Sequence, residues 1–426
     1  MTAAMRPSRA LLRRARAGYR LFVHAREIGW RGAALRAARR LTGVPAPRSE
    51  SADDEKGQPR AGAAFDVIYA VGYWPGEPKR YRVFNMIEAL RAAGYGVYVM
   101  PFEHLDDVRH YRWTARALVL FRAEYDRLVG IDEVLGYARQ TGMRVVYDVD
   151  DLVFDAAVAS GIDAVRRMPR HQYREYIRAT ERRRKLMIAA DLVTVSTGYL
   201  ARRVVELGRP SAVIPNSINT EQQRVAAETM AAPRRHDGLR IAYLSGSATH
   251  QRDFAECEPA LLAVMHRHED VHFRLVGHLD LGPQWQRYGS RVEHIGLLSP
   301  ADMLRSLGEV DINLAPLELG NPFCEGKSEL KFFEAALVGV PTVASATETF
   351  AAAIEDGITG FVARSGDEWE RALELLISDA DRRRAIGEAA RARALARYSL
   401  SAIAPRAVAA LGLRPPPVEA ADAGGA

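Results

Sequence analysis

Short apolar runs rich in β-branched residues alternate with longer helical patterns along most of this chain. The first set of runs is DVIYAVG, GVYVM, ALVLFR, RVVYDVD, DLVTVS and SAVIPN. A second set begins near Leu239 and comprises LRIAYLSG, VHFRLVGHLD, RVEHIGLL, DINLAPLE, PTVASA and GFVARS. Because helices separate the strands, the pattern predicts an α/β fold with mostly parallel sheets covered on both faces. Two successive doubly wound domains fit a length of 426 residues with 48% hydrophobic content.

Polar stretches that contain Pro and Gly divide the chain into segments. We predict a basic amphipathic helical leader at 1–45, a linker at 46–64, a first domain at 65–220, a connector at 221–238, a second domain with its terminal helices at 239–400, and a partly disordered tail at 401–426. The two domains are expected to face each other across a central cleft.

The net charge of +6 is concentrated at the start of the chain. Residues 1–48 contain twelve arginines and one acid, Glu27, so the remainder sums to −5. A mildly acidic body has no surface that could neutralise a nucleic-acid backbone, which excludes general nucleic-acid binding. The two cysteines, Cys257 and Cys324, provide neither a disulfide framework nor a metal site. This usage favours a reducing compartment, and we expect a cytoplasmic protein.

The leader interleaves arginines with apolar side chains such as Phe22 and Trp30. Its longest strongly apolar run, residues 21–23, is far shorter than the ~20 residues that a membrane span needs, and it contains no secretory signal. Basic amphipathic segments bind anionic membranes, so we predict that residues 8–42 contact the inner face of a membrane peripherally. An organelle transit peptide and a solvated helical appendage are the alternatives.

The segment CEGKSELKFFEAALVGVPTVAS places two lysines four residues apart. The chain has only five lysines among 59 basic residues, so their presence here indicates compact point charges of the kind that bind phosphate. A helix from Ser328, its N-cap, to Val338 would align Lys327, Lys331 and Glu334 on the one stripe that is not apolar.

This helix follows the strand DINLAPLE, so its N-terminus is expected at the carboxyl edge of a parallel sheet. Doubly wound folds bind ligands at that edge, and helix N-termini favour anions. A ladder of ion pairs on a solvated face is the alternative.

With its preceding strand, this segment resembles the retaining two-domain (GT-B) glycosyltransferases of the family-4 type. The run DINLAPLELGNPFCEGKSELKFFEAALVGVPTVAS follows the family order of strand, acidic Gly-bearing loop, Glu-bearing helix and G-x-P-V-V-A-S. Glu334 matches the second Glu of the family's E-x7-E motif, whereas Gly326 occupies the position of the first and Glu325 stands one residue early. Further similar segments, including IAYLSGSATHQRDF and AIEDGITGFVARS, extend the resemblance over roughly residues 65–400.

The resemblance implies two Rossmann-like domains and a glycosyltransferase of the hexosyltransferase type. Such an enzyme moves a sugar from a nucleotide-diphosphate sugar to an acceptor hydroxyl, with retention and without a further cofactor or metal. Together with the basic leader, the resemblance also implies that the acceptor is a lipid-linked or cell-surface polysaccharide intermediate.

Site residues follow from the same resemblance. Fixed cations and amides would stabilise the diphosphate leaving group, Glu334 would bind the ribose, and the main chain of Leu297 and Leu298 would bind the base. The expected donor-binding residues are Gly246, Ser247, His250, Arg252, Leu297, Leu298, Ser328, Lys331 and Glu334, with Lys327 as a catalytic residue. Helix capping by His250 and a solvated position for Arg252 are the alternatives.

The strand RVVYDVD ends in an acidic cluster of Asp148, Asp150 and Asp151. We predict that Asp150 and Asp151 are catalytic residues that line the cleft and position the acceptor hydroxyl or act as a base. Helix capping is one alternative. A site for Mg²⁺ or Mn²⁺, as in one-domain (GT-A) glycosyltransferases, is another. Because Gly326 replaces a usual acid, a non-catalytic module that binds sugar nucleotides or glycans also competes with the enzyme.

Overall fold

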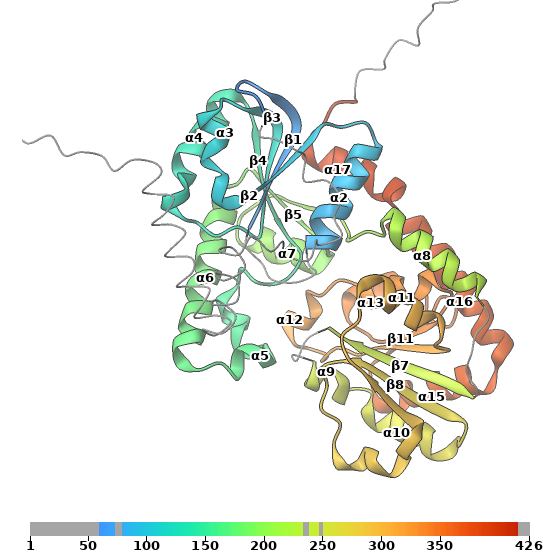
Figure 1. The fold of residues 1–426 in the computed structure, drawn as a ribbon. Helices are drawn as coiled ribbons and strands as arrows, with labels where there is room; N and C mark the ends of the chain where they lie inside the picture. Colours follow the sequence, from blue (N-terminus) through green and yellow to red (C-terminus); the bar gives the residue numbers. More distant parts are fainter. Residues whose placement is uncertain (1–58, 73–78, 233–237, 247–249, 416–426) are drawn as a thin grey trace, which may run out of the picture. The chain divides into compact units, whose positions relative to one another are not determined.

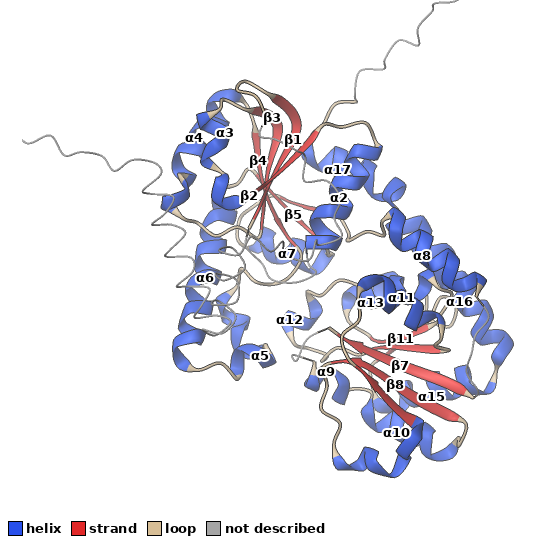
Figure 2. Cartoon of the chain, viewed as in Figure 1, coloured by secondary structure: helices blue, strands red, loops and turns tan. Residues whose placement is uncertain are grey.

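The computed structural model describes residues 59–72, 79–232, 238–246 and 250–415, and the chain from Pro59 onward forms one compact unit. Two parallel sheets have helices on both faces (Figure 2), which confirms the predicted fold class. The predicted leader, most of the linker and residues 416–426 lie outside the described residues. Within the described ranges, no helix combines the length and the apolar character needed to cross a bilayer.

The first sheet contains β1 (Ala64–Val71), β2 (Val97–Pro101), β3 (Thr114–Phe121), β4 (Arg144–Val149), β5 (Leu192–Val195) and β6 (Ser211–Val213). Its order is β2-β1-β3-β4-β5-β6, and the register between β1 and β3 runs from Ala64 opposite Thr114 to Val71 opposite Phe121. The direction of winding reverses between β1 and β3. Doubly wound folds bind ligands at the carboxyl ends of the strands beside such a reversal.

The second sheet contains β7 (Leu239–Ser245), β8 (Val271–Gly277), β9 (Val292–Ile295), β10 (Ile312–Ala315), β11 (Thr342–Ser345) and β12 (Phe361–Ala363). Its order is β12-β11-β10-β7-β8-β9, which places the reversal between β7 and β10. Each of the twelve apolar runs identified in the sequence overlaps one of these described strands.

Helices connect successive strands in both domains (Figure 1). Those of the first domain, with η marking 3-10 or π segments, are η1 (Arg80–Phe84), α2 (Asn85–Ala92), η2 (Phe102–His104), α3 (Asp106–His110), η3 (Arg127–Val129), α4 (Ile131–Thr141), η4 (Ala156–Gly161), α5 (Asp163–Arg166), α6 (Arg170–Ala189) and α7 (Gly198–Glu206). Those that follow are α8 (Thr220–Ala231), α9 (Gln251–Ala255), α10 (Glu258–Arg267), η5 (Pro283–Arg291), α11 (Pro300–Gly308), α12 (Pro322–Glu325), α13 (Leu330–Leu337), α14 (Glu348–Ala353), α15 (Gly366–Ser378), α16 (Ala380–Tyr398) and α17 (Leu400–Leu411).

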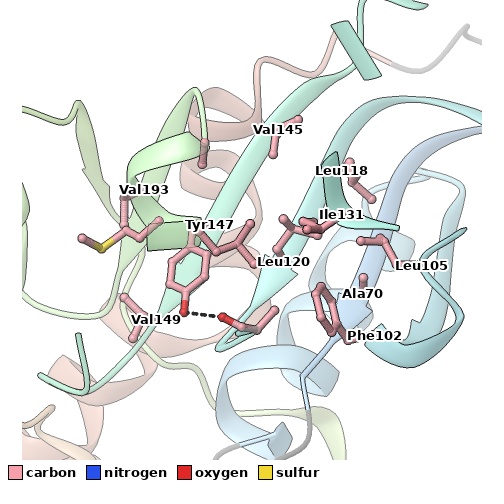
Figure 3. Packing of buried hydrophobic residues seen from close by; sticks show 14 of the residues in the cluster. Ala70, Phe102, Leu105, Leu118, Leu120, Ile131, Val145, Tyr147, Val149 and Val193 are labelled. Atoms are coloured by element: carbon pink, nitrogen blue, oxygen red, sulfur yellow. Dashed lines mark hydrogen bonds between the residues drawn. The ribbon is translucent and has the colours of Figure 1, made fainter. Parts of the chain in front are cut away.

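The core of the first domain packs on both faces of its sheet. On one face, Leu118, Leu120 and Val145 are buried in the same cluster as Tyr147 (Figure 3). The hydroxyl of Tyr147 donates a hydrogen bond of 3.0 Å to the carbonyl oxygen of Ala123. The polar end of this ring is therefore satisfied inside the core, as a buried tyrosine requires.

The helix α17 belongs to the core of the first domain although it follows the second domain in sequence. Ile403, Ala407 and Leu411 are spaced four residues apart and are buried in the same cluster as Val67 and Leu90. Figure 1 shows α17 beside α2. The prediction therefore started the partly disordered tail too early when it placed the boundary at residue 401. This apolar stripe belongs to a packed helix that continues to Leu411.

The connector expected at 221–238 is helical through most of its length, because α8 spans Thr220–Ala231. A capping box begins this helix: the side chain of Asn219 accepts from the Gln222 amide at 2.7 Å, and the Gln222 side chain accepts from the Asn219 amide at 3.0 Å. These reciprocal bonds satisfy two helix-end donors and fix the start of α8.

Candidate active site

The lysine-bearing segment differs from the single helix expected from Ser328 to Val338. In the structure, α12 ends at Glu325 and α13 begins at Leu330, with Glu329 in the cap position. Ser328 does not cap the helix; its hydroxyl accepts a hydrogen bond of 3.0 Å from the Asn216 side chain. Lys327 therefore lies in the loop before α13 and does not share a helical stripe with Lys331 and Glu334.

Gly326 packs closely against the first domain. A Cβ atom at this position would lie 3.1 Å from Cδ2 of Leu200 and 3.5 Å from Cβ of Leu152. The neighbouring Glu325 turns away, and its carboxylate accepts from the backbone amide of Glu348 at 3.1 Å. A glutamate at position 326, as in the E-x7-E motif, would therefore require the side chain of Leu200 to shift.

Lys327 and Arg252 line one small pocket between the two sheets. The pocket is lined by Gly161, Ile162, Asp163, Arg252, Asp253, Glu318, Asn321, Phe323, Cys324 and Lys327. The ammonium group of Lys327 lies 4.7 Å from the centre of the Phe323 ring. Because the pocket includes the loop after β10 and the start of α9, it lies at the winding reversal of the second sheet, where an anionic ligand is expected.

Arg252 joins the two domains at this pocket. Its guanidinium pairs with Glu318, and its backbone amide donates to Asp163 at 3.4 Å. The side chain is 43% exposed. Arg252 thus lines the pocket, but part of its charge is already neutralised by a carboxylate.

His250 occupies the cap position of α9 without capping a backbone amide. Its Nδ1 lies 2.7 Å from Oδ2 of Asp253. Burial lowers the pKa of His250 to about 4, so the ring is neutral at pH 7. Since a carboxylate can only accept, the neutral ring donates its Nδ1 proton to Asp253 and keeps Nε2 as an acceptor.

Asp253 connects three groups in the pocket. Besides His250, it accepts from the Glu318 amide at 3.0 Å and from the Cys324 thiol at 3.3 Å. Burial opposes its ionisation, but the hydrogen bond and charge of His250 and the charge of Lys327 outweigh it and lower the pKa of Asp253. This carboxylate therefore fixes the orientation of His250 relative to Lys327.

Lys331 is half-buried beside the end of β7. Its ammonium group donates to the carbonyl oxygen of Leu244 and lies 5.0 Å from the centre of the Tyr243 ring. Burial lowers the pKa of Lys331 to about 8, although the nearby Glu334 carboxylate opposes this shift. Most of the lysine is still charged at pH 7, so a cation lies directly under the end of β7.

The carboxylate of Glu334 accepts a hydrogen bond from the hydroxyl of Tyr81, which comes from η1 in the first domain. Glu334 is buried on α13, 253 positions from Tyr81 in sequence. The residue expected to bind a ribose therefore also links the two domains.

Among the described residues expected to bind the donor, Arg252 alone lines the pocket with Lys327. The pocket lining does not include the other expected donor residues, which are His250, Ser328, Lys331, Glu334, Gly246, Leu297 and Leu298. Gly246 is exposed directly after β7, Leu297 is 59% exposed after β9, and Leu298 is half-buried beside it. Ser247 lies outside the described residues. Their assignment to amide and base binding stays a prediction.

On the first domain, Arg122 bridges Asp150 and Asp151. Its Nε donates to Asp150 at 2.6 Å and its Nη2 to Asp151 at 2.5 Å. The backbone of Arg122 has a φ of 44°, a left-handed conformation that residues other than glycine rarely adopt. Arg122 follows β3, which borders the winding reversal of the first sheet, and Asp150 and Asp151 follow the next strand, β4.

The environment of Asp150 tunes its charge. Burial raises the pKa of Asp150 to about 6, Arg122 opposes the shift, and Asp151 adds to it. The capping alternative is wrong for both aspartates, because Asp155 is the residue that caps the next helical segment, η4. Arg122 supplies a cation between the two carboxylates. Among the described residues, no group of three acidic, histidine or cysteine side chains is placed to hold a metal ion.

Asp148 has a different partner. It is buried against Arg82, whose Nε lies 2.9 Å from Oδ2, and it accepts from the Thr194 hydroxyl at 2.5 Å. This ion pair ties η1 to β4 and β5, so Asp148 has a role in holding the first domain together.

The sequence reasoning missed Tyr81, Arg122, Asp163 and Asp253. Two had a local signal: Arg122 ends an apolar strand, and Asp253 stands three residues after His250 on one helical face. Tyr81 and Asp163 are brought to the site only by long-range folding.

Comparisons with known proteins identify similar sequences and folds. Residues 252–409 match the sequence model of a family described as glycosyl transferase-like. No curated protein matches the chain. Among solved structures, the chain is similar to sucrose-phosphate synthase from Thermosynechococcus elongatus, with 18% identity and a TM-score of 0.54 over 80% of this chain and 97% of that one.

Two further structures give the same picture. Anabaena Alr3699/HepE in complex with UDP has 15% identity and a TM-score of 0.52 over 82% of this chain and 99% of that one. A glycosyltransferase from Rickettsia africae has 13% identity and a TM-score of 0.53 over 82% of this chain and 98% of that one. The likeness extends over most of each of these proteins and shows that they share this fold.

Proposed function

We propose that this chain, a glycosyltransferase with the GT-B fold, moves a sugar from a nucleotide-diphosphate sugar to a hydroxyl group of an acceptor. The observation that carries the proposal is the pocket at the winding reversal of the second sheet, where Lys327 lies beside the His250–Asp253 pair. The similar HepE structure contains UDP, which supports a nucleoside diphosphate as the ligand of this pocket.

The donor-side chemistry follows from charge. When the bond to the sugar breaks, negative charge develops on the leaving diphosphate, and fixed cations aimed at it lower the barrier. Lys327 lines the pocket, and Lys331 interacts electrostatically with Lys327 and Asp253, which supports both lysines as partners of the diphosphate. The neutral His250 accepts hydrogen bonds through Nε2, which suits contact with a sugar hydroxyl or a protonated phosphate.

The acceptor side is assigned to Asp150 and Asp151. Arg122 holds both carboxylates in place, and an Asp150 pKa of about 6 leaves that carboxylate ionised at neutral pH. We infer retention of configuration from the resemblance to family-4 enzymes. In a retaining mechanism of this kind, a donor phosphate oxygen takes the proton of the acceptor hydroxyl. Asp150 and Asp151 would then position that hydroxyl and need not be strong bases.

The acceptor is proposed to be a lipid-linked or cell-surface polysaccharide intermediate, used by a cytoplasmic protein bound peripherally to the membrane. The basic leader supports this assignment, because twelve arginines against one acid in residues 1–48 favour an anionic surface. Deletion of residues 1–48 should release the protein from phosphatidylglycerol vesicles in a sedimentation assay while donor hydrolysis continues. Unchanged vesicle binding would contradict the membrane role.

The central test is a panel of UDP-, GDP-, ADP- and dTDP-sugars, measured first by thermal stabilisation and then by turnover. Specific binding raises the unfolding temperature by mass action. Lys327→Met should lower kcat by about 10²–10³-fold, the usual loss for one transition-state donor. Lys185→Met removes an exposed lysine of the first domain and should leave turnover unchanged.

The competing function is a module that binds a sugar nucleotide without turnover, which the glycine at position 326 favours. Tight binding of one nucleotide sugar with no hydrolysis and no transfer to any acceptor would favour that module over the enzyme.

A further inference from the structure

A second pocket lies on the first domain where η4, α5 and α6 meet. It is open, has a volume of about 430 Å³, and is lined by Ser160, Arg166, Met168, Arg170, Tyr173 and Arg174. None of these residues belongs to the donor pocket or to the Asp150–Asp151 cluster. Three of the six are arginines and none is acidic, so the pocket is strongly basic.

These arginines have no carboxylate partner in the described part of the chain. Among the described residues, no ion pair involves Arg166, Arg170 or Arg174. Glu175, the acid next to Arg174 in sequence, lies 3.7 Å from Arg178 and 3.0 Å from Arg182. We call the space lined by the six residues the arginine pocket. No acidic side chain within the described ranges compensates its positive charge.

Helix stability alone disfavours this arrangement. Arg170 and Arg174 stand four residues apart on α6, a spacing at which like charges repel. The first turn of α6 contains no acid and has no side-chain cap, so Arg170 faces the positive end of the helix dipole. Charges that destabilise a helix in this way are expected where a bound anion neutralises them. The free backbone amides of the first turn of α6 would also favour an anion.

The arginine pocket adjoins the donor pocket along the chain. Gly161, Ile162 and Asp163 line the donor pocket, whereas Ser160 and Arg166 on either side of them line the arginine pocket. The turn between η4 and α5 therefore separates the two spaces. It is held to the second domain by the Asn321 side chain, which donates to the Gly161 carbonyl oxygen at 2.9 Å.

We propose that the arginine pocket binds the phosphate or diphosphate group of the acceptor substrate, with the apolar part of its carrier against Met168 and Tyr173. Guanidinium groups match phosphate oxygens with paired donors, and three of them suit a doubly or triply charged group. The half-buried Met168 and Tyr173 pack on a small apolar cluster and offer contacts that a free phosphate cannot use. The assignment rests on the proposed function and narrows its acceptor to a phosphate-linked lipid carrier.

The test uses the full-length chain saturated with the nucleoside diphosphate that binds best, so that the donor pocket is filled. Farnesyl diphosphate serves as a soluble prenyl diphosphate, and its binding is measured by calorimetry beside inorganic pyrophosphate and phosphatidylglycerol vesicles. The variant R166Q/R170Q/R174Q is compared with R167Q/R178Q/R184Q, which removes the same charge from exposed positions of the same segment outside the pocket.

We expect farnesyl diphosphate to bind the wild type more tightly than pyrophosphate does. The pocket variant should weaken this binding by about tenfold or more, whereas the control variant should change it by less than about twofold. Equal losses in both variants, or a loss of vesicle binding alone, would overturn the proposal. Nucleoside diphosphate binding is titrated separately in the wild type and in each variant. If the wild type does not bind a nucleoside diphosphate, that result counts against the proposed function and not against the arginine pocket.

Discussion

At the scale of single residues, burial decides the charge of the groups that face the proposed substrates. It lowers the pKa of Lys331 to about 8 and of His250 to about 4, and it raises that of Asp150 to about 6. In each case the loss of water outweighs nearby charges of opposite effect. At neutral pH, Lys331 is therefore mostly charged and His250 is neutral on the donor side, and Asp150 is mostly ionised on the acceptor side.

Lys331 should make both donor binding and stability depend on pH. Its pKa in the folded state lies below the ordinary value of 10.5, so between about pH 8 and 10.5 the unfolded chain binds more protons. The destabilising effect of the buried charge is fully present below about pH 8 and disappears as the pH approaches 10.5. The difference in unfolding free energy between Lys331→Met and the wild type should change across this window, as measured by urea denaturation.

The same titration should weaken nucleoside diphosphate binding as the pH rises through about 8, because the lysine loses its charge. Calorimetry at several pH values should show this loss in the wild type and in Lys185→Met, and a flat profile in Lys331→Met. A wild-type profile in the Lys331→Met variant would rule out the assigned role.

At the scale of elements, buried strands were predictable from sequence and the site helix was not. Runs such as VHFRLVG carry strand-preferring valine and phenylalanine in a short, largely apolar stretch. Because both faces of a parallel sheet are covered, this local pattern predicts the element. The start of α13 depends on a distant residue: Asn216, 112 positions before Ser328, donates to the hydroxyl that would otherwise cap the helix. Likewise the contact between Tyr81 and Glu334 joins residues that no local pattern relates.

A side chain at position 326, in the loop between α12 and α13, should crowd Leu200. Gly326→Glu, which recreates the family motif, should lower the unfolding free energy by about 1–3 kcal/mol through overpacking against Leu200 and Leu152. It should also reduce transfer. Thermal and urea denaturation measure the effect, with Gly136→Ala as the control because a Cβ there meets no atom within 4 Å. A more stable and more active Gly326→Glu variant would contradict the packing argument.

At the scale of the whole molecule, the described chain passes between the two domains twice. It leaves the first domain after β6 through α8 and returns from α16 into α17. Contacts within one domain therefore link residues from opposite ends of the sequence, such as Val67 and Ile403. The composition of the C-terminal segment shows its Pro and Gly residues. It could not show that the apolar stripe of α17 packs into the core of the first domain.

Removal of the α17 contact should affect the first domain more than the donor pocket. Ile403 is fully buried, so Ile403→Ala should lower the unfolding free energy by about 2–4 kcal/mol. Nucleoside diphosphate binding near 20 °C should persist, because the donor pocket contains no residue of α17. Ala409→Ser changes an exposed position of the same helix and should have no measurable effect on urea denaturation.

Because α17 completes the core of the first domain, the order of synthesis differs from the order of completion. The ribosome makes β1 to β6 first, yet the apolar surface around Val67 and Leu90 stays uncovered until residues 400–411 emerge. By then all of β7 to β12 has been released and can fold. The half of the protein that is translated first is thus the last to be finished.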